Sequence, residues 1–475
     1  MIRVKTTARL TLYLYLLVLA FFAVQSAQAE TLLVTPTGST PCKSGLFSVP
    51  RIQEAVNSVA AGSTIYICPG NYPEQVVITK GITLVGVSGN GATGAAADGA
   101  NNPTIVPPSA GLVVSAKDLY GNPNGQPTAA QVLVQTPSNR LSTPIVVNIS
   151  NLIVDGTGGA SSFQDCTTDF VGIYYQNASG TLNHVTARFQ ELSQSLFGCQ
   201  NGLAIYAQSG YGTGGAAKVA IDHSSVHDYD KNGITADGSG TNATITGNYV
   251  VGIGPTTLIA QNGIQLSDSA IGTISGNTVT DDVYINPADC STPSNPPCWS
   301  ATGILLYDSG GSSAKVVTVT ANTVSNAQGG VIIVGDSSGT ADYNKVTSNK
   351  ITTSPSAGIY LLDGIDLCSN NNTAKSNTVF NSSGSGIHID SECEESGGTS
   401  GNNNTVANNT INEACAGVLE GTGAGNSISG NLTYNVLQVT YAGDSCPSGS
   451  GGVAAEKERF GRRESLRPSP HRANN

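Results

Sequence analysis

The chain has 475 residues, including 57 glycines and 21 prolines, and only 11% are charged, whereas an ordinary globular domain has roughly a quarter. Its net charge of −11 is unevenly distributed, because residues 1–29 and 454–475 each carry +3 and residues 30–453 therefore carry −17. A body this acidic repels nucleic acid and anionic membranes, so we expect no nucleic acid and no membrane among the partners.

The first 29 residues have the features of an export signal. A basic start is followed by an apolar run from Leu10 to Val24 and by a small-residue site that ends in Ala27-Gln28-Ala29. We therefore expect residues 1–29 to be a cleaved signal peptide. The protein would then be secreted, either extracellular or periplasmic.

The ten cysteines are even in number, as expected for disulfides in an oxidising compartment. Their spacings match no zinc site. We expect neighbours in the sequence to pair, above all Cys290 with Cys298, because these two cysteines bracket a proline-rich loop.

Residues 30–90 are expected to form an N-terminal cap and the first coils of a repetitive fold. Ile52, Val56 and Val59 lie on one face of a predicted short helix, which would plug the first coil. Residues 91–144 are less regular, and we expect early coils with loop insertions there.

From residue 145 to residue 435 the sequence repeats with a period of about 30 residues. Each repeat has a glycine followed by an aliphatic residue and a short alternating strand, as in Gly263-Ile264-Gln265-Leu266. The repeat glycines are Gly172, Gly202, Gly233, Gly263, Gly303, Gly330, Gly358, Gly386 and Gly417. Each repeat is therefore one structural coil.

A second column within most coils reads aliphatic, two residues, asparagine, one residue, aliphatic. Its asparagines are Asn248, Asn277, Asn322, Asn349 and Asn409. Stacked asparagine side chains can hydrogen-bond from coil to coil, and asparagine tolerates the left-handed backbone of a bend. We interpret this column as a structural ladder.

Two short strands per period, β-branched inward residues and no room for helices predict an all-β fold. Because parallel crossovers are right-handed by strong default, we expect a right-handed parallel β-helix solenoid with an N-terminal capping helix. Residues 436–453 would end the solenoid, and residues 454–475 would form a disordered basic tail.

Over roughly residues 50–435 the chain resembles the pectate lyase-like β-helix superfamily and its parallel β-helix repeats. The stretch Ile52-Gln53-Glu54-Ala55-Val56, followed by Pro69-Gly70-Asn71-Tyr72, is similar to the capping region shared by pectin methylesterases and their non-esterase relatives. Ala220-Ile221-Asp222-His223 resembles the Trp-Ile-Asp-His segment of pectate lyases, but Ala220 replaces the tryptophan and the arginine-rich motif is absent. The resemblance implies the fold, and no catalytic motif of the family is complete.

Aspartates follow several repeat glycines. Asp237 lies four residues after its glycine, whereas Asp268 and Asp308 lie five residues after theirs. On aligned coils such carboxylates lie about 5 Å apart, where they raise each other's pKa unless a hard cation such as Ca²⁺ joins them. We therefore name Asp237, Asp268 and Asp308 as candidate catalytic residues, and Asp237 and Asp268 as candidate calcium ligands. The alternative is that aspartates at the fifth position start turns.

Residues two and four beyond each glycine are expected to face solvent if residues one and three face the core. Tyrosines, amides and one carboxylate on such a rigid face are typical of a sugar-binding strip. The candidate substrate-binding residues are Tyr206, Gln265, Tyr307 and Trp299. Trp299 lies in an insertion at 281–302 that either walls a groove or covers the apolar residues Ile332 and Val334.

These features predict a secreted protein that binds or processes extracellular polysaccharide, by lyase, esterase or epimerase chemistry if it is an enzyme. One alternative is a non-catalytic structural or adhesive surface protein. A second is a periplasmic metal-delivery protein, since some β-helix proteins of this repeat type are described as copper-binding, although five histidines and paired cysteines offer few copper ligands. His223, His227 and His388 are candidate acid or base groups.

Overall fold

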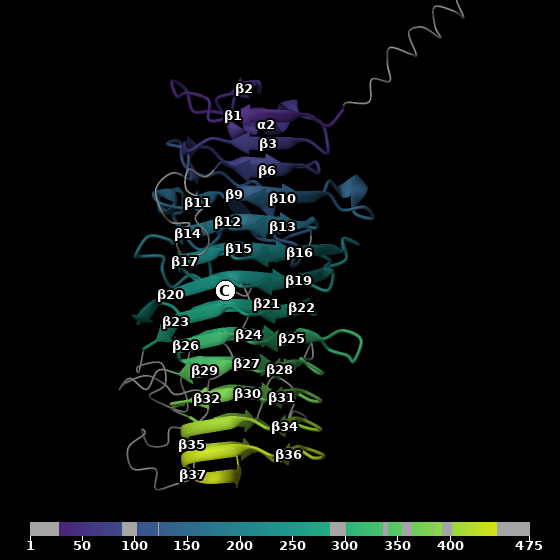
Figure 1. Ribbon diagram of the computed structural model, residues 1–475, viewed down its shortest axis with the longest axis vertical. Coiled ribbons are helices and arrows are strands. Elements are labelled where there is room, and N and C mark those ends of the chain that lie inside the picture. Colours follow the sequence, from purple (N-terminus) through teal and green to yellow (C-terminus); the bar gives the residue numbers. More distant parts are fainter. Residues whose placement is uncertain are drawn as a thin grey trace, which may run out of the picture.

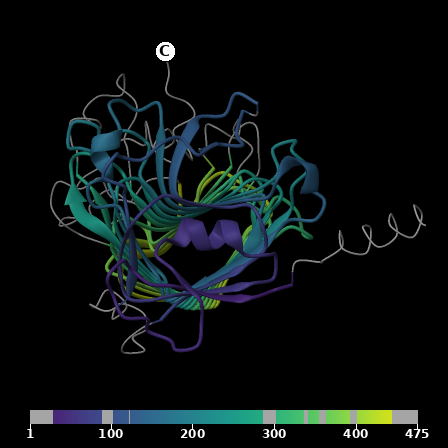
Figure 2. The same cartoon turned by 90° about the horizontal axis from the view of Figure 1, so that it is seen from above.

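The computed structural model describes residues 28–87, 102–121, 123–285, 301–335, 341–353, 363–382, 384–391 and 401–443. Each coil contributes three strands, and the coils stack along the long axis of the molecule (Figure 1). Seen along that axis, the coils superimpose and the helix α2 lies across the N-terminal end of the stack (Figure 2). The fold is the predicted all-β solenoid.

The first strand of each coil belongs to a 14-stranded sheet. Its strands are β1 (Thr31–Val34), β2 (Ser48–Val49), β3 (Thr64–Ile67), β6 (Thr83–Gly86), β10 (Val146–Ser150), β13 (Ser179–Asn183), β16 (Ala217–Asp222), β19 (Thr241–Thr246), β22 (Ile271–Ser275), β25 (Val317–Thr320), β28 (Lys345–Thr347), β31 (Thr373–Lys375), β34 (Thr405–Ala407) and β36 (Ser427–Ser429).

The second and third strands of each coil belong to a 23-stranded sheet. The second series is β4 (Gly70–Pro73), β7 (Pro103–Val106), β11 (Ile153–Asp155), β14 (Thr186–Gln190), β17 (Ser225–Tyr229), β20 (Tyr249–Thr256), β23 (Thr278–Tyr284), β26 (Thr323–Ala327), β29 (Lys350–Thr353) and β32 (Thr378–Phe380).

The third series carries the candidate site, and it runs beside the second along the whole stack. It comprises β5 (Val76–Ile78), β9 (Pro127–Gln135), β12 (Asp169–Gln176), β15 (Leu203–Gln208), β18 (Asn232–Asp237), β21 (Asn262–Ser267), β24 (Thr302–Tyr307), β27 (Gly329–Val334), β30 (Ile365–Cys368) and β33 (Ile387–Ile389). The long strands β35 (Thr410–Glu420) and β37 (Leu432–Ala442) extend through both series, and β8 (Ala116–Lys117) pairs antiparallel with β9.

The expectation of two strands per period was therefore one strand short. Ile245 and Val250, the aliphatic residues on either side of Asn248, lie in two different strands, β19 and β20, rather than in one. The ladder asparagine sits at the bend between them. The repeat glycines mark the third strand of the coil. The asparagine column therefore spans the first and second strands, and the glycine column marks the third.

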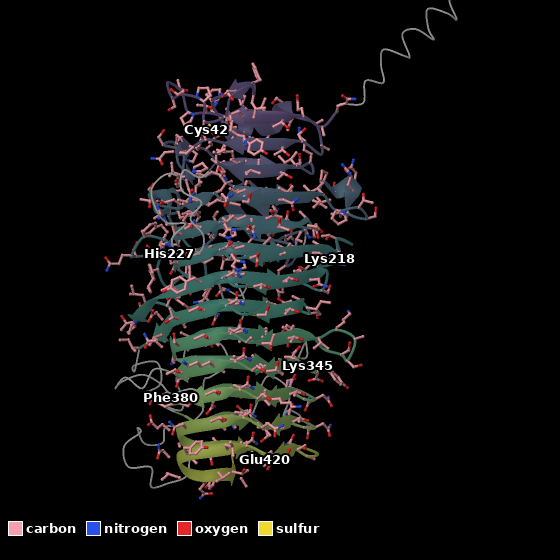
Figure 3. All side chains as sticks on the ribbon, viewed as in Figure 1. Cys42, Lys218, His227, Lys345, Phe380 and Glu420 are labelled. Atoms are coloured by element: carbon pink, nitrogen blue, oxygen red, sulfur yellow. A yellow bond between two sulfur atoms is a disulfide. The ribbon has the colours of Figure 1, made fainter. Side chains whose placement is uncertain are left out.

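The core is a stack of aliphatic side chains that point inward at the same position of successive coils. Ile173, Ile205, Ile234 and Ile264 pair in register on the third series and are fully buried. Close-packed burial of this kind is the main favourable contribution to folding. Charged side chains such as Lys218 project from the outside of the stack (Figure 3).

The asparagine ladder is confirmed. The Oδ1 atom of Asn322 accepts hydrogen bonds from the backbone N–H and from the Nδ2 of Asn277, each at 2.9 Å. Its own Nδ2 donates to the Ile274 carbonyl and to Asn349 Oδ1, also at 2.9 Å. The ladder consists of Asn248, Asn277, Asn322, Asn349, Asn377, Asn409 and Asn431.

The capping helix α2 spans Ile52–Ser58 and buries Ile52, Ala55 and Val56 against the first coil. Its N-terminal end is held by Glu74, whose two carboxylate oxygens accept the backbone N–H groups of Ile52 (2.7 Å) and Gln53 (2.9 Å). A carboxylate satisfies the unpaired donors of a helix N-terminus and opposes its positive dipole end. The predicted helix and its apolar face are therefore confirmed.

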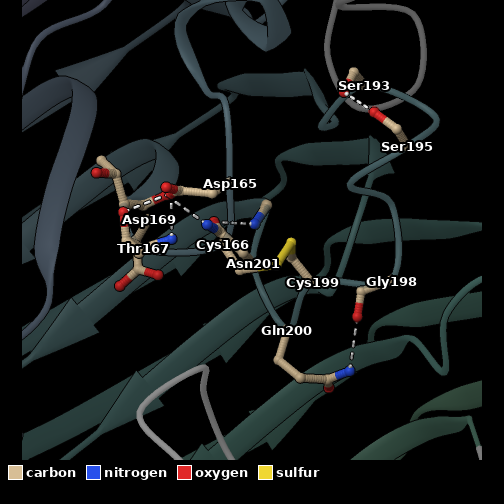
Figure 4. The surroundings of a disulfide bond; sticks show 12 residues. Asp165, Cys166, Thr167, Asp169, Ser193, Ser195, Gly198, Cys199, Gln200 and Asn201 are labelled. Carbon is tan, nitrogen blue, oxygen red and sulfur yellow. Dashed lines mark hydrogen bonds between the residues drawn. A yellow bond between two sulfur atoms is a disulfide. The ribbon is translucent and has the colours of Figure 1, made fainter. Parts of the chain in front are cut away.

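Disulfides join neighbours in the sequence, Cys42 with Cys68 and Cys166 with Cys199. Figure 4 shows the second of these bonds among polar loop residues. Cys368 and Cys415 each also take part in a disulfide bond. Cys290 and Cys298, the pair expected first, lie outside the described residues, as does the signal segment up to residue 27. Among the described residues no helix has the length and hydropathy of a membrane span.

Candidate functional site

The outward face of the third strand series carries most of the predicted site residues. One outward column contains Tyr174, Tyr206, Thr235, Gln265 and Leu305, and the next contains Gln176, Gln208, Asp237, Ser267 and Tyr307. Counting from Gly202 predicts that Tyr206 shares the column of Asp237, which is wrong. Ala204 occupies the glycine position of that coil, while Gly202 is a turn residue with a φ of 83°.

The expectation that this face is open to solvent is also wrong. The exposed fraction is 2% for Tyr206, 3% for Asp237 and 0% for Gln265. Tyr307 (3%) and Asp308 (4%) are buried as well. Alternation along the strand predicts correctly that these side chains point out of the coil, but it carries no information about what covers them.

Residues 112–120, here called the cover segment, lie over part of this face. The backbone N–H of Leu119 donates to Gln208 Oε1 at 2.8 Å. The rings of Tyr174 and Tyr206 stack with centroids 4.9 Å apart and share an apolar cluster with the cover segment. The cover segment therefore converts part of an outward strip into an interior.

Asp237 is the centre of a buried hydrogen-bond network beneath the edge of this cover. Its Oδ2 atom accepts from the Tyr206 hydroxyl at 2.9 Å and from Gln208 Nε2 at 3.0 Å. Its Oδ1 atom accepts from the Tyr211 hydroxyl at 2.7 Å and from Ser267 Oγ at 3.1 Å. Four donors on one carboxylate compensate for its removal from water.

Two further carboxyl groups join the network. Asp118, from the cover segment, lies 2.9 Å from the Tyr206 hydroxyl through its Oδ2 atom. Asp268, in the turn after β21, lies 2.8 Å from the Tyr211 hydroxyl through its Oδ2 atom. We call Asp118, Tyr206, Tyr211, Asp237 and Asp268 the tyrosine-aspartate cluster.

The Tyr211 hydroxyl thus contacts two carboxyl groups, although it has only one hydrogen to donate. Both contacts can be hydrogen bonds only if one carboxyl carries a proton. Burial, and next the negative charge of Asp237, raise the pKa of Asp268 to about 9. Burial, and next the negative charge of Asp118, raise the pKa of Asp237 as well. We place the shared proton on Asp268, with Asp237 accepting from Tyr211. A carboxylic acid and a carboxylate that both contact one hydroxyl group are close enough to donate and accept protons at one substrate.

One edge of the tyrosine-aspartate cluster reaches the surface. Tyr120, Tyr211 and Asp268 are each only partly buried. The rings of Tyr120 and Tyr211 meet edge to face, with centroids 5.7 Å apart and an angle of 78° between planes. Aromatic rings beside a carboxyl group are a common composition of sugar-binding surfaces, because a ring face packs on the apolar face of a sugar.

The other predicted site residues take separate roles in the fold. The Gln265 side chain accepts from Asn232 Nδ2 (2.9 Å) and Asn262 Nδ2 (3.1 Å) within a lattice of buried amides. Tyr307 belongs to a buried apolar cluster with Leu305, Ile332, Val334 and Cys368. Trp299 lies outside the described residues.

The two aspartates at the fifth position have left-handed backbone, with φ values of 51° at Asp268 and 48° at Asp308. This agrees with the alternative that aspartates at this position form turns. Asp268 is a turn residue that also contacts Tyr211, so the two interpretations are compatible there. Whether Asp237, Asp268 and Asp308 act in catalysis, and whether the first two bind calcium, stays a prediction.

A second buried cluster lies further along the same face, around β30 and β33. It consists of Asp363, Asp366, His388 and Asp390, which are at most 4% exposed and which we call the aspartate-histidine cluster. His388 Nδ1 lies 3.3 Å from Asp363 Oδ2, 3.9 Å from Asp366 Oδ1 and 3.9 Å from Asp390 Oδ2. Asp363, Asp366 and His388 could hold a metal ion.

Sequence reasoning found these two clusters only in part. Asp366 was missed because the repeat was counted from Gly358, whereas Gly364 precedes β30 and makes Asp366 an outward residue. Its register partner His388 could have identified it, since both follow a repeat glycine by two residues. Asp118 and Tyr120 were missed because they precede the regular repeats. Of the other candidate histidines, His223 lies in the bend after β16 and pairs with Asp222, and His227 lies on β17 and pairs with Asp228.

Comparisons with known proteins agree with this architecture. Residues 150–346 match the family described as right handed beta helix region. The chain therefore has the right-handed parallel β-helix fold. Residues 291–449 match the family described as periplasmic copper-binding protein (NosD). No curated protein matches the chain. The match to a periplasmic family and the disulfides indicate a location outside the cytoplasm.

Among solved structures, the lacto-N-biosidase GH136 from Eubacterium ramulus is similar with a TM-score of 0.52 and 13% identity, over 87% of this chain and 68% of that chain. The Dettilon tailspike protein matches with a TM-score of 0.49 and 12% identity, over 86% and 68%. The family 28 exopolygalacturonase of Yersinia enterocolitica matches with a TM-score of 0.41 and 11% identity, over 88% and 80%. The first of these matches shows that the fold is shared with the lacto-N-biosidase.

Proposed function

We propose that this is an exported protein that binds and processes a polysaccharide at the exposed edge of the tyrosine-aspartate cluster. Asp268 would donate a proton and Asp237 would accept one. The observation that carries the proposal is the Tyr211 hydroxyl between these two carboxyl groups, 2.7 Å from one and 2.8 Å from the other. Such a paired proton donor and acceptor could serve lyase, esterase or epimerase chemistry.

The surface next to the acid supports a carbohydrate substrate. Tyr120 and Tyr211 are the partly exposed rings beside Asp268, and the cover segment that supplies Tyr120 is anchored on Gln208. A polyanionic glycan would be repelled by residues 30–453, which carry a charge of −17, and would need a cation such as Ca²⁺ to bridge it to the protein. We therefore expect binding to require calcium only if the glycan is anionic. The rings and the carboxyl pair also suit a neutral glycan without calcium.

Calcium at Asp237 and Asp268 is the competing role for the same side chains. Both oxygens of Asp237 already accept two hydrogen bonds, and the Tyr211 hydroxyl lies between the two carboxyl groups. A calcium ion bridging them would have to displace Tyr211 and the proton on Asp268. Proton transfer is therefore the role that the hydrogen bonds favour.

The test is a screen of the purified mature chain against polyuronates and neutral polysaccharides, with and without Ca²⁺. On the substrate found, Asp268→Asn should lower kcat by about 100-fold or more, the usual contribution of a general acid. Asp222→Asn, which changes an aspartate on the first strand series, is the matched control and should keep full activity. Tyr120→Ala should raise KM with little change in kcat.

Three results would contradict the proposal. Full activity of Asp268→Asn would exclude it as the acid. Wild-type turnover that is lost on chelation and restored only by Ca²⁺, together with loss of Ca²⁺ binding on substitution of Asp237 or Asp268, would favour the calcium role. Neither binding nor turnover of any polysaccharide would favour the alternative of a structural or adhesive surface protein.

Metal delivery is a second candidate function. Residues 291–449, which match the periplasmic copper-binding family, include all four residues of the aspartate-histidine cluster. Its test is copper binding by the purified chain, followed by transfer of the ion to an acceptor chelator. Retention of the ion against such a chelator would argue for a resident metal instead.

A further inference from the structure

We propose that the aspartate-histidine cluster binds one divalent transition-metal ion of the first row, independently of the glycan site. The cluster is formed by two adjacent coils, since Asp366 of β30 and His388 of β33 are register partners. Asp363 lies just before β30 and Asp390 just after β33. The three carboxyl groups converge on His388 Nδ1 at the outer face of the third strand series.

The composition of the cluster suits a cation. Three carboxyl groups lie within 3.9 Å of one imidazole nitrogen, and none of the four side chains is more than 6% exposed. Carboxylates buried this closely repel each other strongly. A protonated imidazole supplies one positive charge, whereas a divalent ion supplies two and can contact several oxygens at once.

The distances fit a small ion. Bonds of about 2.0–2.1 Å in tetrahedral coordination separate neighbouring ligand atoms by roughly 3.3 Å. The distance from His388 Nδ1 to Asp363 Oδ2 is 3.3 Å, and the two distances of 3.9 Å need only small side-chain rotations. One ligand atom from each of Asp363, Asp366 and His388 lies within 4.8 Å of the others.

The ligand types narrow the class of ion. An imidazole nitrogen with carboxylate oxygens suits zinc and other first-row divalent ions, whereas Ca²⁺ and Mg²⁺ prefer oxygen ligands alone. Cu⁺ prefers sulfur, but the nearby Cys368 is disulfide-bonded and offers no thiolate. The cluster therefore differs in chemistry from a calcium site.

A neighbouring residue fixes one of the ligands. The Oδ1 atom of Asp363 accepts hydrogen bonds from the backbone N–H of Ser385 at 2.7 Å and from its hydroxyl at 2.8 Å. These bonds direct the Oδ2 atom of Asp363 toward His388. Supporting hydrogen bonds of this kind orient metal ligands and raise metal affinity.

The experiment is calorimetric titration of the chelator-treated full chain with Zn²⁺ and, separately, with Ca²⁺. We expect one Zn²⁺ per chain, with Zn²⁺ bound at least 100-fold more tightly than Ca²⁺. His388→Gln should weaken Zn²⁺ binding at least 100-fold, and Asp366→Asn at least 10-fold. His223→Gln, which changes a surface histidine paired with Asp222 at 2.9 Å, is the matched control and should bind as the wild type does.

Two measurements keep the test decisive if a variant folds poorly. In the wild type, Zn²⁺ should raise the Tm by several degrees and chelation should reverse the rise. Co²⁺ in place of Zn²⁺ should give visible absorption bands of a tetrahedral site. Absence of Zn²⁺ binding, tighter binding of Ca²⁺, or loss of binding in His223→Gln with retention in His388→Gln would overturn the proposal. Asp268→Asn should bind Zn²⁺ normally, so this test is independent of the glycan site.

Discussion

Asp237 and Asp366 both point outward from the third strand series, and both are buried beside other carboxyl groups. Around Asp237, tyrosine hydroxyls lie between the carboxyl groups and a proton on Asp268 removes one of the charges. Around Asp366, the carboxyl groups face an imidazole. The same outward face thus accommodates buried acidic residues in two ways, by shared protons in one cluster and by a cation in the other. The two clusters should therefore respond differently to mutation, pH and metal.

The largest expected effect is on the first cluster. Asp237→Ala removes the acceptor of four buried hydrogen bonds, which Tyr206, Gln208, Tyr211 and Ser267 donate. A hydrogen bond to a charged group contributes about 1.5–3 kcal/mol, so we expect the free energy of unfolding to fall by about 3 kcal/mol or more, although Asp118 and Asp268 remain as second acceptors. Urea denaturation followed by circular dichroism measures this. A loss below about 1 kcal/mol would show that the network is not a stabilising unit.

The asparagine ladder supports both clusters and should affect neither selectively. Asn322→Ala removes the acceptor of the Asn277 N–H groups and the donor to Ile274 and Asn349. We expect a loss of about 2 kcal/mol, measured by the same denaturation, with glycan turnover and Zn²⁺ affinity unchanged. A selective loss of either activity would mean that the ladder positions one cluster.

The pH dependence of stability also distinguishes the two clusters. The pKa of Asp268 rises from its usual 3.8 to about 9 in the folded chain, chiefly through burial. The folded protein therefore holds this proton more tightly than the unfolded chain does, so its contribution to stability is complete below about pH 4 and is lost as the pH rises toward 9. Urea midpoints should fall over this interval, and Asp268→Asn should flatten the decline. An unchanged slope in that variant would assign the proton elsewhere.

The smallest expected effect concerns the second cluster. Ser385→Ala removes the hydroxyl that donates to Asp363 and leaves the backbone donor in place. We expect a loss of about 1 kcal/mol in stability and roughly 10-fold weaker Zn²⁺ binding, measured by denaturation and calorimetry. Ser385→Thr keeps the hydroxyl and should restore the affinity. Equal affinities of the alanine variant and the wild type would separate Ser385 from the metal site.

Most of the fold could be predicted from the sequence because each coil repeats the same local signals. Glycine, alternating aliphatic residues and a bend asparagine recur in most coils, and the structure places Asn322 and Ile264 where that pattern requires. The errors arose where the pattern is ambiguous. Gly202 lies in a turn with a positive φ and is not the repeat glycine of its coil. Ala204 occupies that position instead, because a small side chain fits there.

The site could be predicted less well because some of its residues come from segments outside the repeats. Outward alternation identified Asp237, but Asp118 and Tyr120 come from the cover segment, whose sequence does not indicate which coils it will lie on. Burial of Gln265 and Tyr307 likewise depends on what lies outside the coil. Periodicity predicts the direction of a side chain, while its environment is decided by distant parts of the chain.

The cover segment also bears on the order of assembly. Asp118 contacts Tyr206 and Gln208, which follow it by 88 and 90 residues. During synthesis from the N-terminus, residues 112–120 are made before the coils on which they rest, so they cannot reach their final place until β15 has stacked on β12. Coils can add one after another through local contacts, whereas this closure must wait for a long-range contact. The tyrosine-aspartate cluster, which includes Asp118 of the cover segment, is therefore completed late in folding, after the coils beneath it are built.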